Sequence, residues 1–141
     1  MLPSDSPRIR ALRMLMALDG TVLTVLGIAF LFCPNQIEEA FHFKDVSPSV
    51  NFLVGLWGCA LLSLGVGYFV AAVNPVEHRL WAAIGAFRGG LEALFGWWCL
   101  SRGIVIWKQS GLTILLAGVM ALAYLALYPR QTRDESWKLP D

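Results

Sequence analysis

Three charged residues stand inside apolar stretches of this sequence, where charges are unusual. Asp19 interrupts the first apolar stretch, and Arg88 and Glu92 interrupt the third. A charge in an apolar environment is costly unless it is paired, and an arginine has the planar geometry to bind two carboxylates. The residue types therefore predict a buried Asp19–Arg88–Glu92 cluster, provided that the first and third stretches lie side by side.

The composition indicates which environment surrounds these charges. The chain has 141 residues, of which 57% are hydrophobic and 15% are charged, whereas an average soluble domain has about 25% charged residues. A lipid bilayer accommodates so much apolar surface better than a small soluble core does. The net charge of +1 argues against a nucleic-acid partner, which requires a basic face. The expected partner is the lipid bilayer.

The apolar stretches predict an all-α fold, a polytopic membrane protein with four transmembrane helices. A signal peptide is not indicated, because the first stretch is long and lacks a small-residue cleavage site. Residues 35–43 have the pattern of a short amphipathic helix at the membrane surface, in the first loop. The predicted spans are residues 11–33, 50–73, 80–100 and 111–128, within a membrane domain at 11–128 and between tails at 1–10 and 129–141.

Basic residues predict the orientation, since four spans place both termini on one side of the membrane. That side carries the larger number of basic residues, which marks the cytoplasmic side. We therefore expect a bacterial cytoplasmic (inner) membrane protein with both termini in the cytoplasm. The cytoplasmic set is Arg8, Arg10, Arg13, Arg79, Arg130, Arg133 and Lys138, against Lys44, Arg102 and Lys108 on the other side.

The depths of the three charges can now be compared. Asp19 follows Ala11 by eight residues, and Arg88 follows Leu80 by eight residues. At roughly 1.5 Å per residue, both lie about 12 Å below the same boundary. Glu92 lies roughly 6 Å deeper on the same helix face as Arg88. The spacing therefore predicts that Arg88 reaches both carboxylates.

Two interpretations of this cluster stay open. The ion pair can serve only to fix which helices pack together, and its net stabilisation is then small. Alternatively, two carboxylates facing one base leave a net charge of −1, and burial favours protonation of one of them. Glu92, the deeper carboxyl, is the expected proton carrier. The cluster would then relay protons or bind a cationic or polar ligand.

Small residues predict where helices approach closely. In the second stretch they recur every four residues, and the third stretch has a similar set around Arg88. We expect both sets to face neighbouring helices, with a pore lining as the alternative for the second stretch. The residues are Gly55, Cys59, Ser63 and Gly67, followed by Gly85 and Gly89.

Cysteine and histidine residues show no metal-binding spacing, so no metal and no cofactor are expected. Cys33 and Cys99 both lie near the outer ends of their predicted helices. A disulfide between them is possible in an oxidising periplasm if the helices touch, and free thiols are the alternative. No catalytic triad is visible, so an enzyme is not expected.

The chain resembles small bacterial four-helix membrane proteins of the DoxX-like and BphX-like kind. The resemblance rests on the segments FLFCPNQIEEAFHF and AAIGAFRGGLEALFGWW, and it covers residues 11–128. Some members of these families look like accessory membrane partners of oxidoreductases, which implies a redox-related context. The resemblance carries over no catalytic residue.

Two functional hypotheses follow. The first is a structural or accessory subunit of a larger membrane complex, in which the Asp19–Arg88–Glu92 cluster holds the bundle together. The second is a proton-coupled or small-solute transporter that acts through this cluster. Four helices leave little room for a pathway within one chain, so a transporter is expected to work as a homo-oligomer.

Overall fold

The computed structural model describes residues 6–33, 36 and 48–129, and these residues form an all-helical fold. The predicted helical class is confirmed. The amphipathic helix expected at 35–43 lies outside the described residues, apart from Gln36. The helices are α1 (Pro7–Phe32), α3 (Pro48–Val73), α4 (Arg79–Ser101) and α5 (Trp107–Leu127).

The start of α1 differs from the predicted boundary. The side chain of Ser6 accepts a hydrogen bond from the backbone N–H of Ile9, and Pro7 occupies the first turn. A serine cap followed by proline is a strong helix-start signal. The helix therefore begins at Pro7 and not at Ala11, and part of the predicted N-terminal tail is helical.

The turn between α4 and α5 differs from the predicted boundary of the fourth span. Gly103 adopts a φ of +69°, a left-handed conformation that favours glycine. The side-chain oxygen of Gln109 accepts a hydrogen bond from the backbone N–H of Ile106 at 3.0 Å. This contact caps α5, so that the helix begins at Trp107 rather than at Gly111.

Three of the helices are long and apolar enough to cross a membrane. They are α1, α5 and the Val50–Val73 part of α3. Helix α4 has 23 residues and is not among these three candidates, since Arg88 and Glu92 stand in its middle. The structure therefore supports a membrane protein with three candidate spans.

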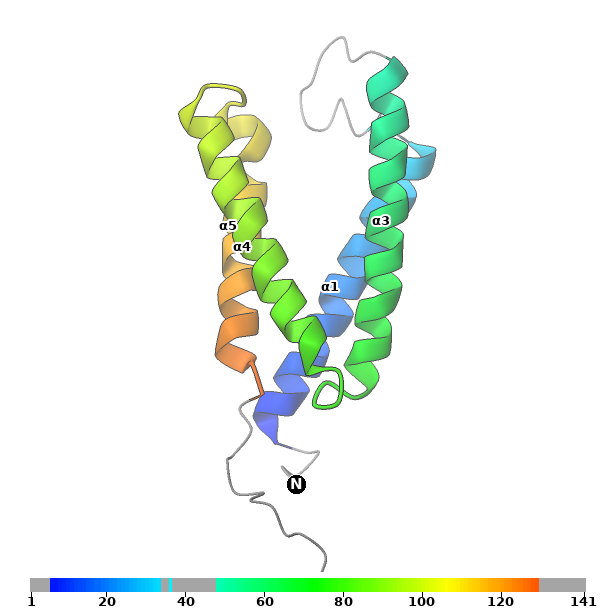
Figure 1. Cartoon of the computed structure of the whole chain (residues 1–141), viewed down its shortest axis with the longest axis vertical. Coiled ribbons are helices and arrows are strands. Elements are labelled where there is room, and N and C mark those ends of the chain that lie inside the picture. Colours follow the sequence, from blue (N-terminus) through cyan, green and yellow to red (C-terminus); the bar gives the residue numbers. More distant parts are fainter. Residues whose placement is uncertain (1–5, 34–35, 37–47, 130–141) are drawn as a thin grey trace, which may run out of the picture.

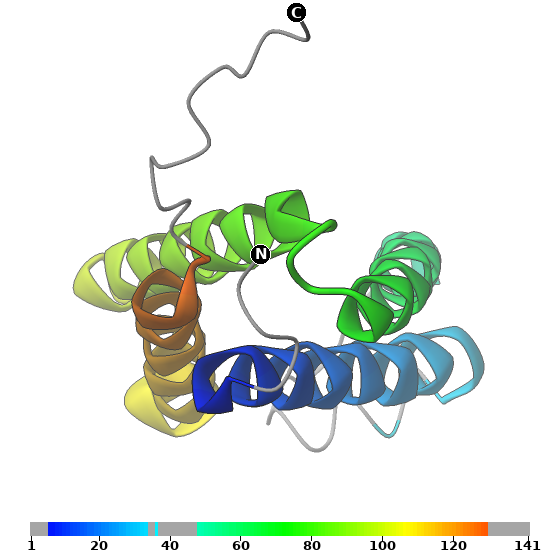
Figure 2. The same cartoon turned by 90° about the horizontal axis from the view of Figure 1, so that it is seen from below.

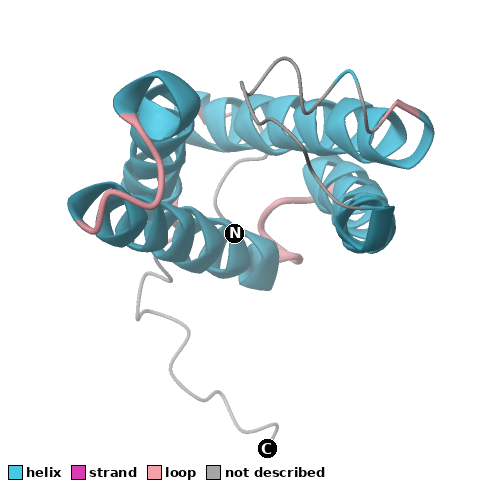
Figure 3. Cartoon of the chain, turned by 90° about the horizontal axis from the view of Figure 1, so that it is seen from above, coloured by secondary structure: helices cyan, strands magenta, loops and turns pink. Residues whose placement is uncertain are grey.

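The four helices form two antiparallel pairs, α1 with α3 and α4 with α5 (Figure 1). The pairs meet at the end where α1 and α4 begin and diverge toward the other end. Seen along the helices, the four are arranged around a ring, with α1 and α4 on opposite sides (Figures 2 and 3). Contacts within each pair outnumber those between the pairs.

Glycines bring α1 and α3 into backbone contact. A Cβ atom added at Gly27 would lie 2.9 Å from the carbonyl oxygen of Gly58, and one at Gly58 would lie 2.9 Å from that of Gly27. Gly20 and Gly65 face each other in the same way, at 3.1 and 3.0 Å. Distances this short leave no room for a side chain, so these four positions fix the packing of the pair.

Helices α4 and α5 approach through Gly85 and Gly89. A Cβ atom at Gly85 would meet the ring of Tyr124 at 2.5 Å, and one at Gly89 would lie 2.7 Å from the carbonyl oxygen of Ala117. Both glycines lie on the α5 side of α4, where the sequence places a close helix contact. An alanine in place of either glycine would force the two helices apart.

The small-residue strip predicted for the second helix is not its main packing surface. A Cβ atom at Gly55 would meet nothing within 4 Å, and Cys59 and Ser63 are exposed. Gly67 does lie against Trp81 of α4. A four-residue repeat rotates about 40° around a helix at each step, whereas a seven-residue repeat rotates about 20°. The seven-residue pair of Gly58 and Gly65 therefore stays on one face, and the predicted strip does not.

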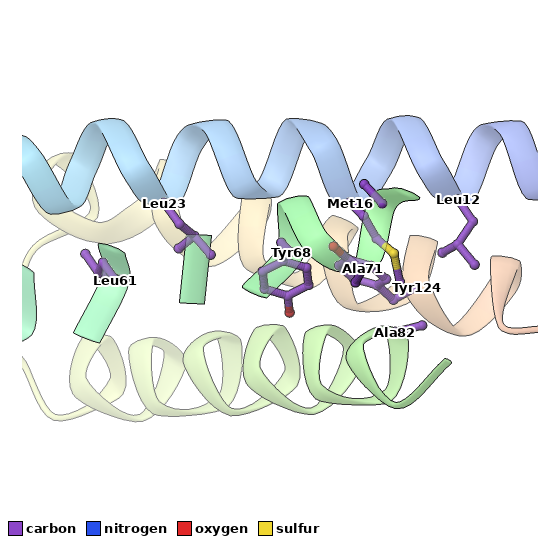
Figure 4. Close-up of a cluster of buried hydrophobic side chains, with 9 residues drawn as sticks. Leu12, Met16, Leu23, Leu61, Tyr68, Ala71, Ala82 and Tyr124 are labelled. Atoms are coloured by element: carbon purple, nitrogen blue, oxygen red, sulfur yellow. The ribbon is translucent and has the colours of Figure 1, made fainter. Parts of the chain in front are cut away.

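The core lies where the two pairs meet (Figure 4). It combines aliphatic side chains of α1 with aromatic side chains of α3 and α5. The largest fully buried side chains are Tyr68, Tyr124, Leu12, Met16 and Pro75.

Two arginines at the start of α1 bind the ends of the neighbouring helices. Nη2 of Arg8 donates to the carbonyl oxygens of Ala126 at 2.7 Å and Tyr128 at 3.1 Å. Nη2 of Arg13 donates to the carbonyl oxygen of Val73 at 3.3 Å. A cation near helix C-terminal carbonyls is favourable, so these contacts help to join the three helices at this end.

Candidate functional site

Asp19 lies in the middle of α1 and is 3% exposed. Nη2 of Arg88, on α4, donates hydrogen bonds to its two carboxylate oxygens at 2.7 and 3.0 Å. This ion pair reaches from one side of the ring of helices to the other. The predicted contact between Asp19 and Arg88 is therefore confirmed.

Tyr124 of α5 is a third member of this site. Its hydroxyl donates a hydrogen bond to Oδ2 of Asp19 at 2.9 Å, and the residue is fully buried. Tyr124 is not among the residues that the sequence pattern predicts for this site. The available signal was a phenol hydroxyl within an aliphatic helix, because such a group needs a polar partner when it is buried.

Tyr68 of α3 completes the site from the fourth helix. Cζ of Arg88 lies 5.4 Å from the centre of the Tyr68 ring, a cation–π contact. The same ring packs edge-on against Trp81 at 5.2 Å and lies 6.0 Å from the ring of Tyr124. Each described helix thus contributes one residue. We call Asp19, Tyr68, Arg88 and Tyr124 the polar hub.

The hydrogen bonds of the polar hub are incomplete. Among the described residues, Nε and Nη1 of Arg88 and the hydroxyl of Tyr68 are buried and have no hydrogen-bond partner. Asp19 places both of its oxygens on a single nitrogen of Arg88, so the paired geometry typical of arginine and carboxylate is not used. The hub therefore keeps unused donors in an apolar environment, where they are costly.

Glu92 does not occupy the buried position predicted for it. Its side chain is 43% exposed, and Oε1 lies 3.6 Å from Nε of Arg88. Toward its C-terminal end, α4 runs away from α1 and α3 (Figure 1), which agrees with the exposure of this carboxylate. The prediction of a cluster with three buried charges is wrong for Glu92, although the residue still contacts Arg88.

The charges of the site can be counted from these contacts. Asp19 and Arg88 neutralise each other, and Glu92 adds one negative charge on the open side only when it is ionised. No disulfide joins Cys33 and Cys99, since Cys33, Cys59 and Cys99 are all free thiols. Within the described part of the chain, no group of three or more metal-binding side chains comes together.

A separate apolar groove of about 410 Å³ lies between α4 and α5, and none of its lining residues belongs to the polar hub. Its walls are Ala83, Ala86, Phe87, Leu125 and Tyr128. These side chains offer apolar surface and one phenol ring. The groove therefore has the character of a lipid-facing depression rather than of a polar binding site.

The polar hub joins the four helices through a buried ion pair between α1 and α4 and two tyrosines from α3 and α5, with a half-exposed carboxylate beside it. This arrangement can hold the two helix pairs together, and it can exchange a proton or a polar ligand through its open side. Comparison with known proteins adds no relative, since no protein-family model matches the chain and no solved structure matches it significantly.

Proposed function

We propose that this protein is an accessory subunit of a larger membrane complex, with a structural role for the polar hub. The observation that carries the proposal is the Asp19–Arg88 ion pair, reinforced by Tyr124. It joins two helix pairs that are otherwise packed mainly within themselves. An ion pair used in this way selects which helices associate.

In this proposal α4 is a fourth membrane span. Its 23 residues extend for about 35 Å, and the hydrocarbon core of a bilayer is about 30 Å thick. Arg88 is paired inside the protein, which reduces the cost of placing it in the membrane. The resulting four-span arrangement agrees with the antiparallel path of the chain through α3, α4 and α5 (Figure 1).

The proposed orientation places both termini in the cytoplasm of a bacterial cell, at its inner membrane. Support comes from the end of the molecule where α1 and α4 begin, which carries four described arginines. The opposite end carries two described basic residues, and a basic excess marks the cytoplasmic side. These sets are Arg8, Arg10, Arg13 and Arg79, against Arg102 and Lys108.

The proposed partner binds the open side of the molecule. Beyond the hub, the face of α4 that carries Arg88 continues with Glu92 and Phe95, and Phe95 is 65% exposed. A membrane helix of the partner would pack against Phe95 on this face, and Glu92 would stay open to the lipid beside it. The resemblance to DoxX-like and BphX-like proteins favours an oxidoreductase as the larger partner.

Purification of the tagged protein from its native membrane in a mild detergent tests this proposal. We expect a larger membrane protein in a fixed ratio to the chain. Arg88→Leu should lose this partner, whereas Gly90→Ala should keep it, because a Cβ atom at Gly90 meets nothing within 4 Å. Recovery of the chain alone would contradict the accessory role.

A proton-coupled or small-solute transporter is the second candidate. The half-exposed Glu92 beside Arg88 favours it, because a reachable carboxylate next to a buried ion pair can bind a proton or a cation. A homo-oligomer whose melting temperature rises with a small solute would support transport, since a ligand stabilises the state that binds it.

A further inference from the structure

We infer that Glu92 is a proton-binding site that opens to the membrane, with its side chain held as a neutral carboxylic acid. The inference rests on the proposed placement of α4 in the membrane. It assigns a chemical state and a reactivity to this residue, neither of which follows from an accessory role. It applies whether or not the protein transports anything.

The surroundings of Glu92 are apolar on its open side. The neighbouring side chains of Leu91 and Phe95 are 51% and 65% exposed, and in a membrane such surfaces contact lipid. Glu92 stands near the middle of α4, far from either end of the helix. An ionised carboxylate at this depth would be costly, so a full countercharge or a proton is required.

The available countercharge is already engaged. Arg88 is the one cation among the hub residues and Glu92, and its Nη2 holds both oxygens of Asp19 within 3.0 Å. Oε1 of Glu92 lies 3.6 Å from Nε, which is too long for a hydrogen bond. Asp19 is a second carboxylate on the far side of Arg88, and its negative charge further disfavours an ionised Glu92.

The other groups around the guanidinium do not supply a positive charge. Tyr68 from α3 and Tyr124 from α5 are neutral phenols, and Asp19 from α1 is an acid. The five groups together carry a net charge of −1 when both acids are ionised and are neutral when Glu92 binds a proton. The neutral state is the one that an apolar environment favours.

Proton release from Glu92 has a structural consequence. An ionised Glu92 attracts the guanidinium away from Asp19, because Oε1 lies 3.6 Å from Nε and the Arg88 side chain must shift toward Glu92 to form a hydrogen bond. The ion pair between the two helix pairs is therefore strongest when Glu92 is protonated. Proton binding on the open side is in this way coupled to the contact between the pairs.

An apolar carbodiimide reports this state directly. A neutral carboxylic acid transfers its proton to one carbodiimide nitrogen while its oxygen bonds to the central carbon, and the acyl group then moves to nitrogen as a stable N-acylurea. The product contains every atom of both reactants. An ionised carboxylate lacks the proton for the first step, so labelling decreases as the carboxyl loses its proton.

The experiment treats native membranes with N,N′-dicyclohexylcarbodiimide and locates the adduct by mass spectrometry of peptides. We expect one adduct, on Glu92, which is lost in Glu92→Gln and which decreases as the pH rises and the carboxyl group loses its proton. Asp19→Asn should lower the labelling of Glu92 by about tenfold or more, because the freed Arg88 then stabilises the ionised carboxylate. Glu77, in the turn before α4, should react only with a water-soluble carbodiimide.

Two results would overturn the inference, and they have different meanings for the proposed function. Labelling of Glu92 by the water-soluble reagent alone would place this part of α4 in water, and the four-span proposal would fail with the inference. Absence of labelling by both reagents would show that Glu92 is ionised or covered, and would overturn the inference alone. The accessory role is decided separately, by whether a partner is recovered.

Discussion

The interface within the α1–α3 pair and the contact between the two pairs are built in different ways. Within the pair, glycines bring backbone against backbone, as at Gly27 and Gly58. Between the pairs, Arg88 of α4 and Tyr124 of α5 bind the carboxylate of Asp19. The first interface requires glycines, which have no side chain, and the second requires the charges of Asp19 and Arg88. Substitutions should therefore damage the two regions through different mechanisms.

The largest effect is expected from Asp19→Leu. Removal of the carboxylate leaves the Arg88 guanidinium without its buried partner and with only the half-exposed Glu92 beside it, which costs about 3 kcal/mol. The measurement is the apparent free energy of unfolding in a titration with sodium dodecyl sulfate. Thr21→Leu is the matched control on the exposed side of α1, with an expected change of about 0.5 kcal/mol or less. Equal effects of the two substitutions would contradict the role of the ion pair.

Gly27→Ala should have the next largest effect and tests the other region. The added Cβ atom would lie 2.9 Å from backbone atoms of α3, so the pair must separate at a cost of about 2 kcal/mol or more. Gly55→Ala is the control, since its Cβ atom meets nothing within 4 Å and alanine favours helix. The same titration gives both values. A destabilisation by Gly55→Ala as large as that by Gly27→Ala would show that the glycine contacts do not hold the pair.

The two hub tyrosines provide a smaller and more selective comparison. Tyr124→Phe removes the hydroxyl that donates to Asp19 at 2.9 Å, with an expected loss of about 1.5 kcal/mol. Tyr68→Phe removes a buried hydroxyl that has no hydrogen-bond partner among the described residues, so stability should stay the same or rise. A greater loss of stability for Tyr68→Phe than for Tyr124→Phe would show that the hydroxyl of Tyr68, and not that of Tyr124, stabilises the hub.

The smallest effect is expected at the start of α1. Arg13→Gln weakens the contact with the end of α3 and should cost about 0.5 kcal/mol, and less at high salt. Arg10→Gln, at an exposed position of the same helix, is the control. Melting temperatures of the two variants at low and high salt provide the measurement, and identical salt dependence would show that the contact contributes nothing.

The sequence predicted those features that depend on length, order and depth along a helix. Short connections join the last three helices, so neighbouring helices must run antiparallel. This path places Asp19 and Arg88 at the same depth along the bundle. Depth counting therefore found this contact although 69 positions separate the two residues. The helix ends were less predictable, because Ser6 and Gln109 set them through local capping contacts.

The features that the sequence did not predict depend on how the helices diverge and rotate. Glu92 shares a face with Arg88, yet it is exposed because the pairs separate beyond the hub (Figure 1). The four-residue repeat of small side chains in α3 does not show which face of the helix packs against its neighbour. The predicted contact was therefore at Gly55, whereas Gly58 makes the contact with α1. Tyr68 and Tyr124 were missed because an aromatic residue in an apolar helix is usually only packing.

A double-mutant cycle between Asp19 and Arg88 tests whether their ion pair joins the two helix pairs. The free energy of unfolding is measured for the unchanged protein, Asp19→Leu, Arg88→Leu and the double variant. If the ion pair joins the two helix pairs, the double variant should be less destabilised than the sum of the single variants by about 2 kcal/mol or more. Additivity within about 0.5 kcal/mol would show that the two residues do not interact, and the account of the polar hub would be wrong.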